Sequence, residues 1–415
     1  MNPVKADNAL KDLMRSLALG RGMLTGLTVA FGTRDRQEAF SVGLKREVIK
    51  TGNAFTPAPE RIDRNTVYDL ASLTKLFTLV SVLQLLQQGR LKESDSIREI
   101  DRRFIYLKNC TLFDCLCYLG RLQTPQRVDA QPDAQSAERM VFQTRLFPLQ
   151  GSRCYSDMNA LVLKYVVELA SGLSFYDYLR RHILHPLGME ETWVVVPDGR
   201  QNNLMDYNHE HRVINGEYQI IDSALPGLPH DPKARLLGEG GRSLSGHAGL
   251  FSTAGDMCRF AQGLLSGKLL PMETLRGIGV NRTGYLTSVG EYRQFLGMLC
   301  FSKSPVARLS EVPSFMGLRA FALAGYTGNH LAIDPDLGVF DLFLGNRCHN
   351  RVSLVKPEEQ AESLGLSEQG DGKVLWPDGR LVKSSFRYIY QKDRMLHAPV
   401  KDCLMERGWL PEYTG

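Results

Sequence analysis

An apolar segment that begins beside a serine and a lysine is the strongest local signal in this sequence. Apolar residues recur at helical spacing from Leu73 to Gln88, and Gly89 ends the pattern, which predicts a helix. Ser72 and Lys75 stand at its start as Ser-x-x-Lys. Residues three apart lie on one face of a helix, so the lysine amine can approach the serine hydroxyl.

A serine and a lysine in this arrangement are typical of nucleophilic catalysis. Burial in a dry pocket disfavours the charged amine, so we expect Lys75 to be neutral and able to accept the proton of Ser72. The helix N-terminus would also favour negative charge that develops near Ser72. The structural alternative for the same pattern is a capping serine followed by a surface lysine.

Chain length and strand pattern predict a two-lobed body with one sheet. The 415 residues exceed the roughly 250–300 at which a single hydrophobic core usually stops growing. Helical and loop-rich sequence from about residue 90 to 235 predicts a helical lobe, with helices at Leu161–Leu169 and Phe175–Ile183 and a further helix at Ala254–Leu265. Strands are predicted near both chain ends. They are Leu27–Phe31, Ala39–Leu44, Gly317–Ala324, His330–Ile333 and Val339–Leu344.

Several segments together resemble the serine β-lactamase and penicillin-binding-protein family, which includes class C β-lactamase-related hydrolases, esterases and transacylases. The run Tyr68–Lys75 is similar to the nucleophile segment of that family, and Tyr155-Ser156-Asp157 is similar to its Tyr-x-Asn element with Asp in third place. Three further stretches extend the resemblance over roughly residues 25 to 356. They are His185–Thr192, Ser245–Ala254 and Ala324–Arg347.

The resemblance implies an α/β fold of the α+β type, in which an antiparallel sheet flanked by helices carries an inserted, mainly helical lobe. We expect one catalytic domain over residues 1–356. Its sheet lobe would come from residues 1–90 and 250–356, and its helical lobe from about 91–249. Residues 357–415 form a C-terminal extension of unknown role, with a hairpin predicted around Pro377-Asp378-Gly379-Arg380.

The resemblance also assigns roles in acyl transfer. Ser72 would be the nucleophile, Lys75 its base, and Tyr155 the group that protonates the departing atom. The backbone amides of Ser72 and Tyr326 would form the oxyanion hole, which needs N–H donors and no particular side chain.

One departure from the family pattern falls on the third motif, His or Lys followed by Thr-Gly. Aligned on Ile333-Asp334-Pro335, the motif corresponds to Leu323-Ala324-Gly325, where only the glycine is kept. The missing cation or imidazole argues against ordinary penicillin hydrolysis. A shifted register with Tyr326-Thr327-Gly328 in that place is the second choice, because a shift of three reverses the faces of a strand.

Other residues are candidates for contact with substrate. We expect this of Asp157, His247, Leu323, Gly325, Asn329 and His330. Asp157 could also orient Lys75 by its charge, and His247 or His330 could supply the missing acid. By contrast, His209-Glu210-His211 lacks a third ligand at useful spacing and is predicted to be a solvated loop.

Composition narrows the possible partners. Lys and Arg number 50 against 45 Asp and Glu, without the basic block interleaved with aromatics that nucleic acid requires. Charges at Lys5, Asp7 and Lys11 interrupt any apolar stretch at the start, so we expect neither a signal peptide nor a membrane span, and a cytoplasmic location. The eight cysteines show no pair at metal spacing, so neither metal nor cofactor is expected.

The sequence therefore predicts a serine hydrolase that forms an acyl-enzyme with a small-molecule ester, amide or peptide. An acyltransferase with an amine or alcohol acceptor is the alternative within the same family. A non-catalytic binding protein that keeps the pocket is the alternative from another class, suggested by the lost third motif.

Overall fold

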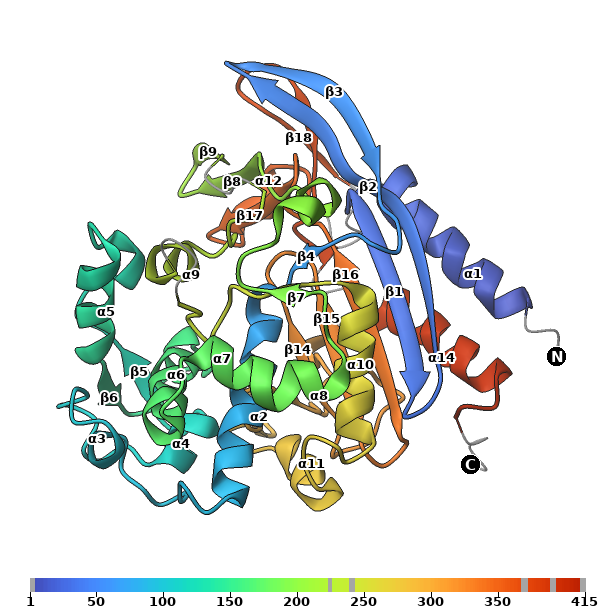
Figure 1. Cartoon of the computed structure of the whole chain (residues 1–415). Helices are drawn as coiled ribbons and strands as arrows, with labels where there is room; N and C mark the ends of the chain where they lie inside the picture. The colour runs from blue at the N-terminus through green and yellow to red at the C-terminus, as the bar shows by residue number, and fades with distance from the viewer. Residues whose placement is uncertain (1–3, 223–225, 239–242, 367–371, 389–392, 411–415) are drawn as a thin grey trace.

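A seven-stranded antiparallel sheet forms the centre of the protein (Figure 1). The computed structural model describes residues 4–222, 226–238, 243–366, 372–388 and 393–410. The strands are, in spatial order, β13 (Phe301–Ser302), β14 (Phe321–Ala324), β15 (His330–Asp334), β16 (Val339–Gly345), β1 (Gly26–Thr33), β2 (Gln37–Thr51) and β3 (Ala54–Arg61). Because β1 pairs with β16, the sheet is built from both ends of the chain, as predicted.

Helices cover both faces of this sheet (Figure 1). The α-helices of the described residues are, in chain order, α1 (Val4–Arg15), α2 (Thr74–Gln87), α3 (Ile97–Ile100), α4 (Leu112–Leu116), α5 (Ala134–Phe142), α6 (Asp157–Ser171), α7 (Phe175–Leu179), α8 (His185–Leu187), α9 (Pro232–Leu237), α10 (Ala254–Leu265), α11 (Met272–Ile278), α12 (Gln360–Ser363) and α14 (Ala398–Glu406). The predicted fold class, an antiparallel sheet flanked by helices with a mainly helical segment inserted between its strands, is confirmed.

The alternation of side chains along the strands creates two hydrophobic cores. Leu331 and Leu342 face α2, α6 and α10 on one side of the sheet, whereas Ala332 and Phe343 face α1 and α14 on the other. Successive residues of a strand point to opposite faces, so neighbours in sequence belong to different cores. This division decides which strand residues can reach a site at the start of α2.

Short strands hold the connecting segments in place. They form small sheets of β4 (Tyr68–Asp69), β10 (Phe251–Ser252) and β7 (Thr192–Trp193); of β17 (Val352–Lys356), β8 (Glu210–Ile214) and β9 (Glu217–Ile221); and the pairs β5 (Arg121–Gln123) with β6 (Arg145–Phe147), β11 (Tyr285–Leu286) with β12 (Tyr292–Arg293), and β18 (Lys373–Leu375) with β19 (Leu381–Lys383). The last pair confirms the hairpin predicted around Pro377–Arg380.

One predicted strand is longer than expected, and one expectation about local structure is wrong. The strand predicted at Ala39–Leu44 runs on to Thr51 and forms with β3 a long hairpin that extends beyond the rest of the sheet (Figure 1). The segment His209–His211, predicted to be a solvated loop, leads into β8 with Glu210 and His211 fully buried. Glu210 is buried because Arg212 and His230 both pair with its carboxylate.

The C-terminal segment belongs to the same packed body. Helix α14 lies beside α1 (Figure 1), and its residues Val400 and Leu404 share a core with Leu10 and Met14. His397 bonds the buried Asp341 of β16 through a 2.5 Å contact between Nδ1 and Oδ2. The division into a domain of residues 1–356 and a separate extension remains a proposal.

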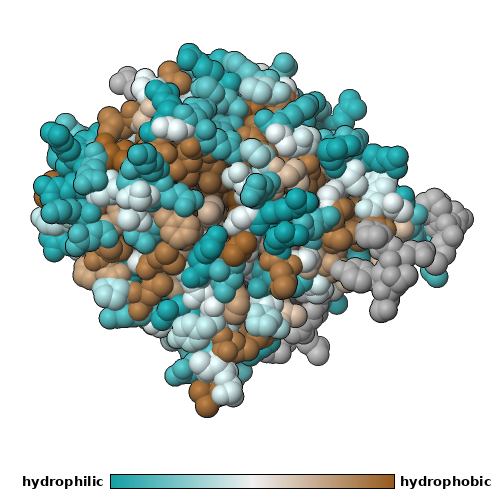
Figure 2. All heavy atoms as spheres, turned by 90° about the horizontal axis from the view of Figure 1, so that it is seen from below, coloured by the Kyte–Doolittle hydropathy of each residue, from teal (hydrophilic) through white to brown (hydrophobic). Residues whose placement is uncertain are grey.

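No single helix within the described residues has the length and apolar character needed to cross a membrane, although the pair Asp157–Ser171 and Phe175–Leu187, bent by 72°, meets these criteria when taken together. Figure 2 shows one face of the molecule, where hydrophilic side chains lie between smaller hydrophobic groups.

The stacked rings of Phe77 and Phe260 join α2 to α10, with 4.2 Å between their centroids. Both rings are fully buried, so we expect Phe77→Ala to lower the free energy of unfolding by about 3–5 kcal/mol. Chemical denaturation measures this loss. Val289→Ala, at a side chain 82% exposed, serves as control and should change stability by no more than about 0.5 kcal/mol. A loss below about 1 kcal/mol for Phe77→Ala would contradict this packing.

Candidate active site

The turn before Ser72 has an unusual backbone conformation that the surrounding residues hold. Ala71 has φ 48°, a left-handed conformation that costs a residue with a side chain about 1–2 kcal/mol. The Ala71 N–H donates to Asp69 Oδ1 at 2.8 Å, and His230 N–H donates to Asp69 Oδ2 at 2.6 Å. Ser72 follows in a short 3-10 helix, Ala71–Leu73, that leads directly into α2. The hydroxyl thus lies at the positive end of a helix.

Ser72, Lys75 and Asp157 form a continuous chain of contacts. Lys75 Nζ lies 2.7 Å from Ser72 Oγ and 2.8 Å from Asp157 Oδ1. It also donates to the backbone carbonyl of His247 at 3.2 Å. The lysine side chain has no exposed surface, so these oxygens replace its water shell. The predicted approach of the amine to the hydroxyl is present in the structure.

The protonation state expected for Lys75 needs correction. Burial is the largest influence and lowers the pKa of the Lys75 ammonium, but Asp157 and Tyr155 together raise it by more, so the pKa lies above its usual value. Burial raises the pKa of Asp157, yet Lys75, His247 and Lys233 together hold it well below its usual range. At neutral pH the two residues are therefore an ion pair between a buried lysine and a partly exposed aspartate, and Lys75 is charged rather than neutral.

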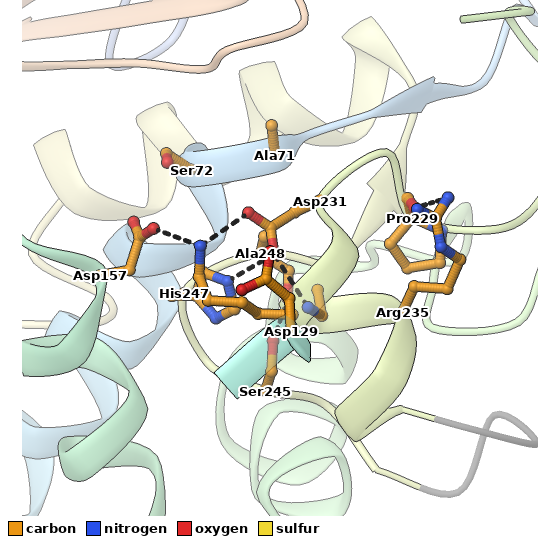
Figure 3. A network of polar contacts seen from close by, with 12 residues as sticks. Ala71, Ser72, Asp129, Asp157, Pro229, Asp231, Arg235, Ser245, His247 and Ala248 are labelled. Carbon is orange, nitrogen blue, oxygen red and sulfur yellow. Dashed lines mark hydrogen bonds and ion pairs between the residues drawn. The ribbon is translucent and has the colours of Figure 1, made fainter. Parts of the chain in front are cut away.

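A second set of charges lies behind Asp157. Lys233 Nζ is 3.0 Å from Asp157 Oδ2 and 3.4 Å from Asp231 Oδ2, while His247 Nε2 is 2.9 Å from Asp231 Oδ1. Asp157, Asp231 and His247 lie close together below Ser72 (Figure 3). Asp231 also caps α9, because its Oδ1 accepts from Ala234 N–H. The start of α9 thereby places Lys233 against Asp157.

Tyr155 lies on the other flank of Lys75. Its ring stacks on Phe301 of β13 with 5.4 Å between centroids, and Lys75 Nζ is 4.9 Å from its ring centre. The hydroxyl oxygen is buried and forms no hydrogen bond of normal geometry among the described residues. Burial raises the pKa of this hydroxyl, although the Lys75 charge opposes the rise. Tyr155 is therefore a neutral phenol at neutral pH.

The connection from β14 to β15 brings Gly325 and Tyr326 to the turn before Ser72. A Cβ on Gly325 would lie 2.9 Å from the Leu70 carbonyl oxygen, so only glycine permits this approach. Within the described residues, none of the hydrogen bonds uses the backbone N–H of Ser72 or of Tyr326 as donor. Two amide donors are thus available beside the serine.

Three of the residues expected to contact substrate are used differently, and these expectations are corrected. Leu323 is fully buried in the core that contains α2. Asn329 donates from Nδ2 to Asp69 O at 2.8 Å and accepts at Oδ1 from Gly345 N–H, so it fastens the sheet to the serine turn. His330 points to the opposite face, where its ring packs on Phe343 and His397. Asp157, His247 and Gly325 do lie at the site.

Sequence reasoning missed Lys233 and Asp231. The signal present in the sequence is Asp231-Pro232, an N-cap residue followed by proline, which predicts the start of a helix. Nothing in the spacing indicates that this helix start meets Asp157, which is 74 positions earlier by subtraction of 157 from 231. Sequence reasoning also missed the buried pair of Glu210 and His230. The backbone N–H of His230 donates to the Asp69 carboxylate and so supports the serine turn.

Within the described residues, three groups of acidic, histidine and cysteine side chains lie close enough together to bind one metal ion each. The group nearest Ser72 contains Asp157, Asp231 and His247. Its two carboxylates already pair with Lys75 and Lys233, so ammonium groups of the chain occupy the positions beside them.

Comparison with known proteins gives a consistent result. The family model "Beta-lactamase" matches residues 10–364. The chain is 28% identical over 337 residues to the protein named "Putative D-alanyl-D-alanine carboxypeptidase" of Escherichia coli K12, covering 73% of this chain and 74% of that protein.

Two solved structures share the fold. A mutant of simvastatin synthase from Aspergillus terreus has 15% identity and a TM-score of 0.64, covering 97% of this chain and 98% of its own. EstCE1, described as a hydrolase with promiscuous acyltransferase activity, has 17% identity and a TM-score of 0.65, covering 95% of this chain and 99% of its own. The fold predicted from the resemblance is confirmed.

Asp157→Asn should destabilise the protein in a pH-dependent way. With the carboxylate removed, a charged Lys75 would be left buried at a cost of about 3–5 kcal/mol. Burial then dominates and lowers the pKa of Lys75 below its unfolded value of about 10.4, so the unfolded chain binds more protons and stability rises with pH in that window. The wild-type pair adds no such slope, because the pKa of Lys75 is raised and that of Asp157 is lowered.

The stability gap between wild type and Asp157→Asn should therefore narrow from about pH 6 to about pH 9, measured by chemical denaturation. Asp12→Asn removes an exposed carboxylate paired with Arg15 and should show no gap that changes with pH. A constant gap for Asp157→Asn would mean that Lys75 keeps one protonation state without its partner.

Proposed function

The chain belongs to the beta-lactamase family, an enzyme family of serine hydrolases and acyltransferases, and we propose that Ser72 is its nucleophile in the hydrolysis of a small ester, amide or peptide. The observation that carries this proposal is the 2.7 Å contact between Ser72 Oγ and Lys75 Nζ, made where the lysine is fully buried. A capping serine followed by a surface lysine would not bury the amine. The strained turn at Ala71 supports the same conclusion, because such strain is concentrated at functional sites.

Lys75 acts as a proton relay in this proposal. Since the amine is already protonated at rest, it can accept the Ser72 proton only while it releases one of its own. Asp157 Oδ1, at 2.8 Å from Nζ, is within reach to receive it. The proton of Ser72 moves to Lys75 as Lys75 passes a proton to Asp157. The amine therefore stays cationic beside the oxygen that attacks.

The remaining steps follow the usual course of acyl transfer. Ser72 Oγ bonds to the carbonyl carbon, and the amides of Ser72 and Tyr326 stabilise the oxyanion, each contributing about 3 kcal/mol. The bond to the leaving alcohol or amine then breaks. The leaving group takes the proton held by Asp157, delivered through Lys75 and the Tyr155 hydroxyl. Water finally releases the acid and restores the hydroxyl of Ser72.

Substrate choice is the finer part of the proposal. The E. coli relative is named a carboxypeptidase, which makes a peptide one possible substrate class. An alcohol or amine that replaces water at the acyl-enzyme would make the same site an acyltransferase. A silent binding pocket would not need the buried pair of Ser72 and Lys75.

Labelling tests the role of Ser72 directly. After incubation with a fluorophosphonate, intact-mass spectrometry should detect one adduct on the wild type and none on Ser72→Ala, since only an activated serine reacts rapidly with this reagent. A chromogenic short-chain ester should be turned over by the wild type alone. Absence of both adduct and turnover in a folded wild type would make the silent-pocket alternative the leading one.

The relay through Asp157 predicts a particular pH profile. Wild-type kcat/KM for the ester should be nearly flat from about pH 6 to about pH 9, because neither Lys75 nor Asp157 titrates there. In Asp157→Asn, Lys75 must lose its proton to act as a base, so the rate should rise by about tenfold or more over this range.

Glu168→Gln is the matched control for this profile. Glu168 lies on the same helix as Asp157 and pairs with the buried Lys164 at 2.8 Å. Its removal should leave the profile flat. A flat profile in Asp157→Asn as well would exclude Asp157 from the proton path.

A further inference from the structure

We propose that a pocket beside Tyr155 binds a carboxylate on the substrate, so that the preferred substrates are esters or amides with an anionic group several bonds from the reacting carbonyl. This inference rests on the proposed function and concerns the substrate of the same site. It is carried by the position of the pocket, by the charges that line it and by the missing cation of the third motif.

The pocket is a cavity of about 520 Å³ that is linked to the serine–lysine pair through Tyr155, one of its lining residues. Tyr155 and Ser156 form one wall, and the loop that follows Arg121 forms the other. Because the Tyr155 ring is 4.9 Å from Lys75 Nζ, a substrate held at Ser72 passes this ring to enter the pocket. The lining residues are Arg121, Leu122, Gln123, Thr124, Pro125, Gln126, Arg127, Arg153, Cys154, Tyr155, Ser156 and Met158.

The lining is positively charged. It contains Arg121, Arg127 and Arg153, and no aspartate or glutamate is among the described residues that line it. Arg127 pairs with Asp129 at 2.5 Å, which neutralises one of these charges. Arg121 and Arg153 have no carboxylate within salt-bridge distance in the part of the chain that the structure describes. Two guanidinium groups therefore face the cavity with their charge uncompensated.

Arg121 is held in position for a ligand. It lies in β5, and its guanidinium is 5.8 Å from the ring centre of Phe147 in the paired strand β6. Its Nε is buried and has no hydrogen-bond partner among the described residues. A buried donor without a partner is costly, and an entering carboxylate would satisfy it.

The rest of the pocket fits the chain that would connect the carboxylate to the carbonyl. Leu122, Pro125 and Met158 add apolar surface to the lining. At the strand edge, where related enzymes carry a cation, this chain has Leu323-Ala324-Gly325. The charges that could recognise an anionic substrate thus lie on the helical side of the site.

Matched pairs of esters test the inference. The mono-4-nitrophenyl esters of adipic and suberic acid carry a carboxylate where 4-nitrophenyl hexanoate and octanoate carry a methyl group. Wild type should show kcat/KM about tenfold higher for the acid of each pair, and Arg121→Gln and Arg153→Gln should each reduce this ratio about threefold. Both variants should still turn over the neutral esters, which shows that they fold.

Three controls separate charge from structure. Arg153→Lys keeps the charge and should keep most of the preference, whereas Arg90→Gln removes an exposed arginine outside the pocket and should leave the ratio unchanged. About 0.5 M sodium chloride should weaken the wild-type preference, because exposed charges are screened. Ser72→Ala gives the spontaneous hydrolysis rate to be subtracted.

The outcomes are distinguishable. Turnover of the neutral esters without a preference for the acids would overturn the carboxylate pocket and leave the proposed function intact. A preference for the acids that survives in both glutamine variants would do the same. Absence of turnover for both members of each pair would overturn the proposed function itself and, with it, this inference.

Discussion

The ion pair between Lys75 and Asp157 is the interaction on which the arrangement around Ser72 depends. A buried ammonium is several kcal/mol less stable than in water unless its hydrogen bonds and charge are both satisfied. Ser72 Oγ, Asp157 Oδ1 and the His247 carbonyl provide these contacts. Asp157 needs a second cation for its other oxygen, and Lys233 provides it. The position of α9 follows from this requirement, because Lys233 stands in its first turn.

The backbone around the serine is fixed by a residue with no direct part in the proposed chemistry. Asp69 accepts from the amides of Ala71 and His230 through its carboxylate. Its backbone carbonyl accepts from Thr327 Oγ1 and Asn329 Nδ2. One residue thus joins the serine turn, the segment before α9 and the β14–β15 connection. Because Gly325 permits a close approach at the same point, the segment that carries the Tyr326 amide reaches the serine turn.

The sequence predicted well what depends on local periodicity and on contiguous motifs. The helix at α2, the strands β1, β15 and β16 and the approach of Lys75 to Ser72 all follow from patterns within a few residues. The charge of Lys75 could not be predicted in this way. It depends on the balance between burial and a carboxylate contributed by α6, and periodicity does not report which acid meets which base. Lys233 was missed for the same reason.

His330 illustrates a different limit. Its position after the β14–β15 turn suggested contact with substrate, but alternation along β15 places it on the face covered by α14, next to Asp341 and His397. The bounds of β15 were predicted within one residue. The face that each of its residues occupies was not, since both faces of this sheet are buried and both carry apolar residues. A pattern of polar and apolar alternation assigns faces only where one side meets water.

The charges around Tyr326 offer a physical reason why Leu323–Gly325 carries no cation. A cation at this end of β14 would stand close to the Tyr326 segment, where the partly exposed Arg212 and the buried Arg347 already lie against the Tyr326 ring. A further positive charge there would repel both guanidinium groups and lack a free acid, because Glu210 is fully engaged by Arg212, His230 and Tyr326. The uncompensated charges of this site lie instead at Arg121 and Arg153. An anionic substrate that follows them would extend from Ser72 past Tyr155 toward the helical lobe, away from the strand edge.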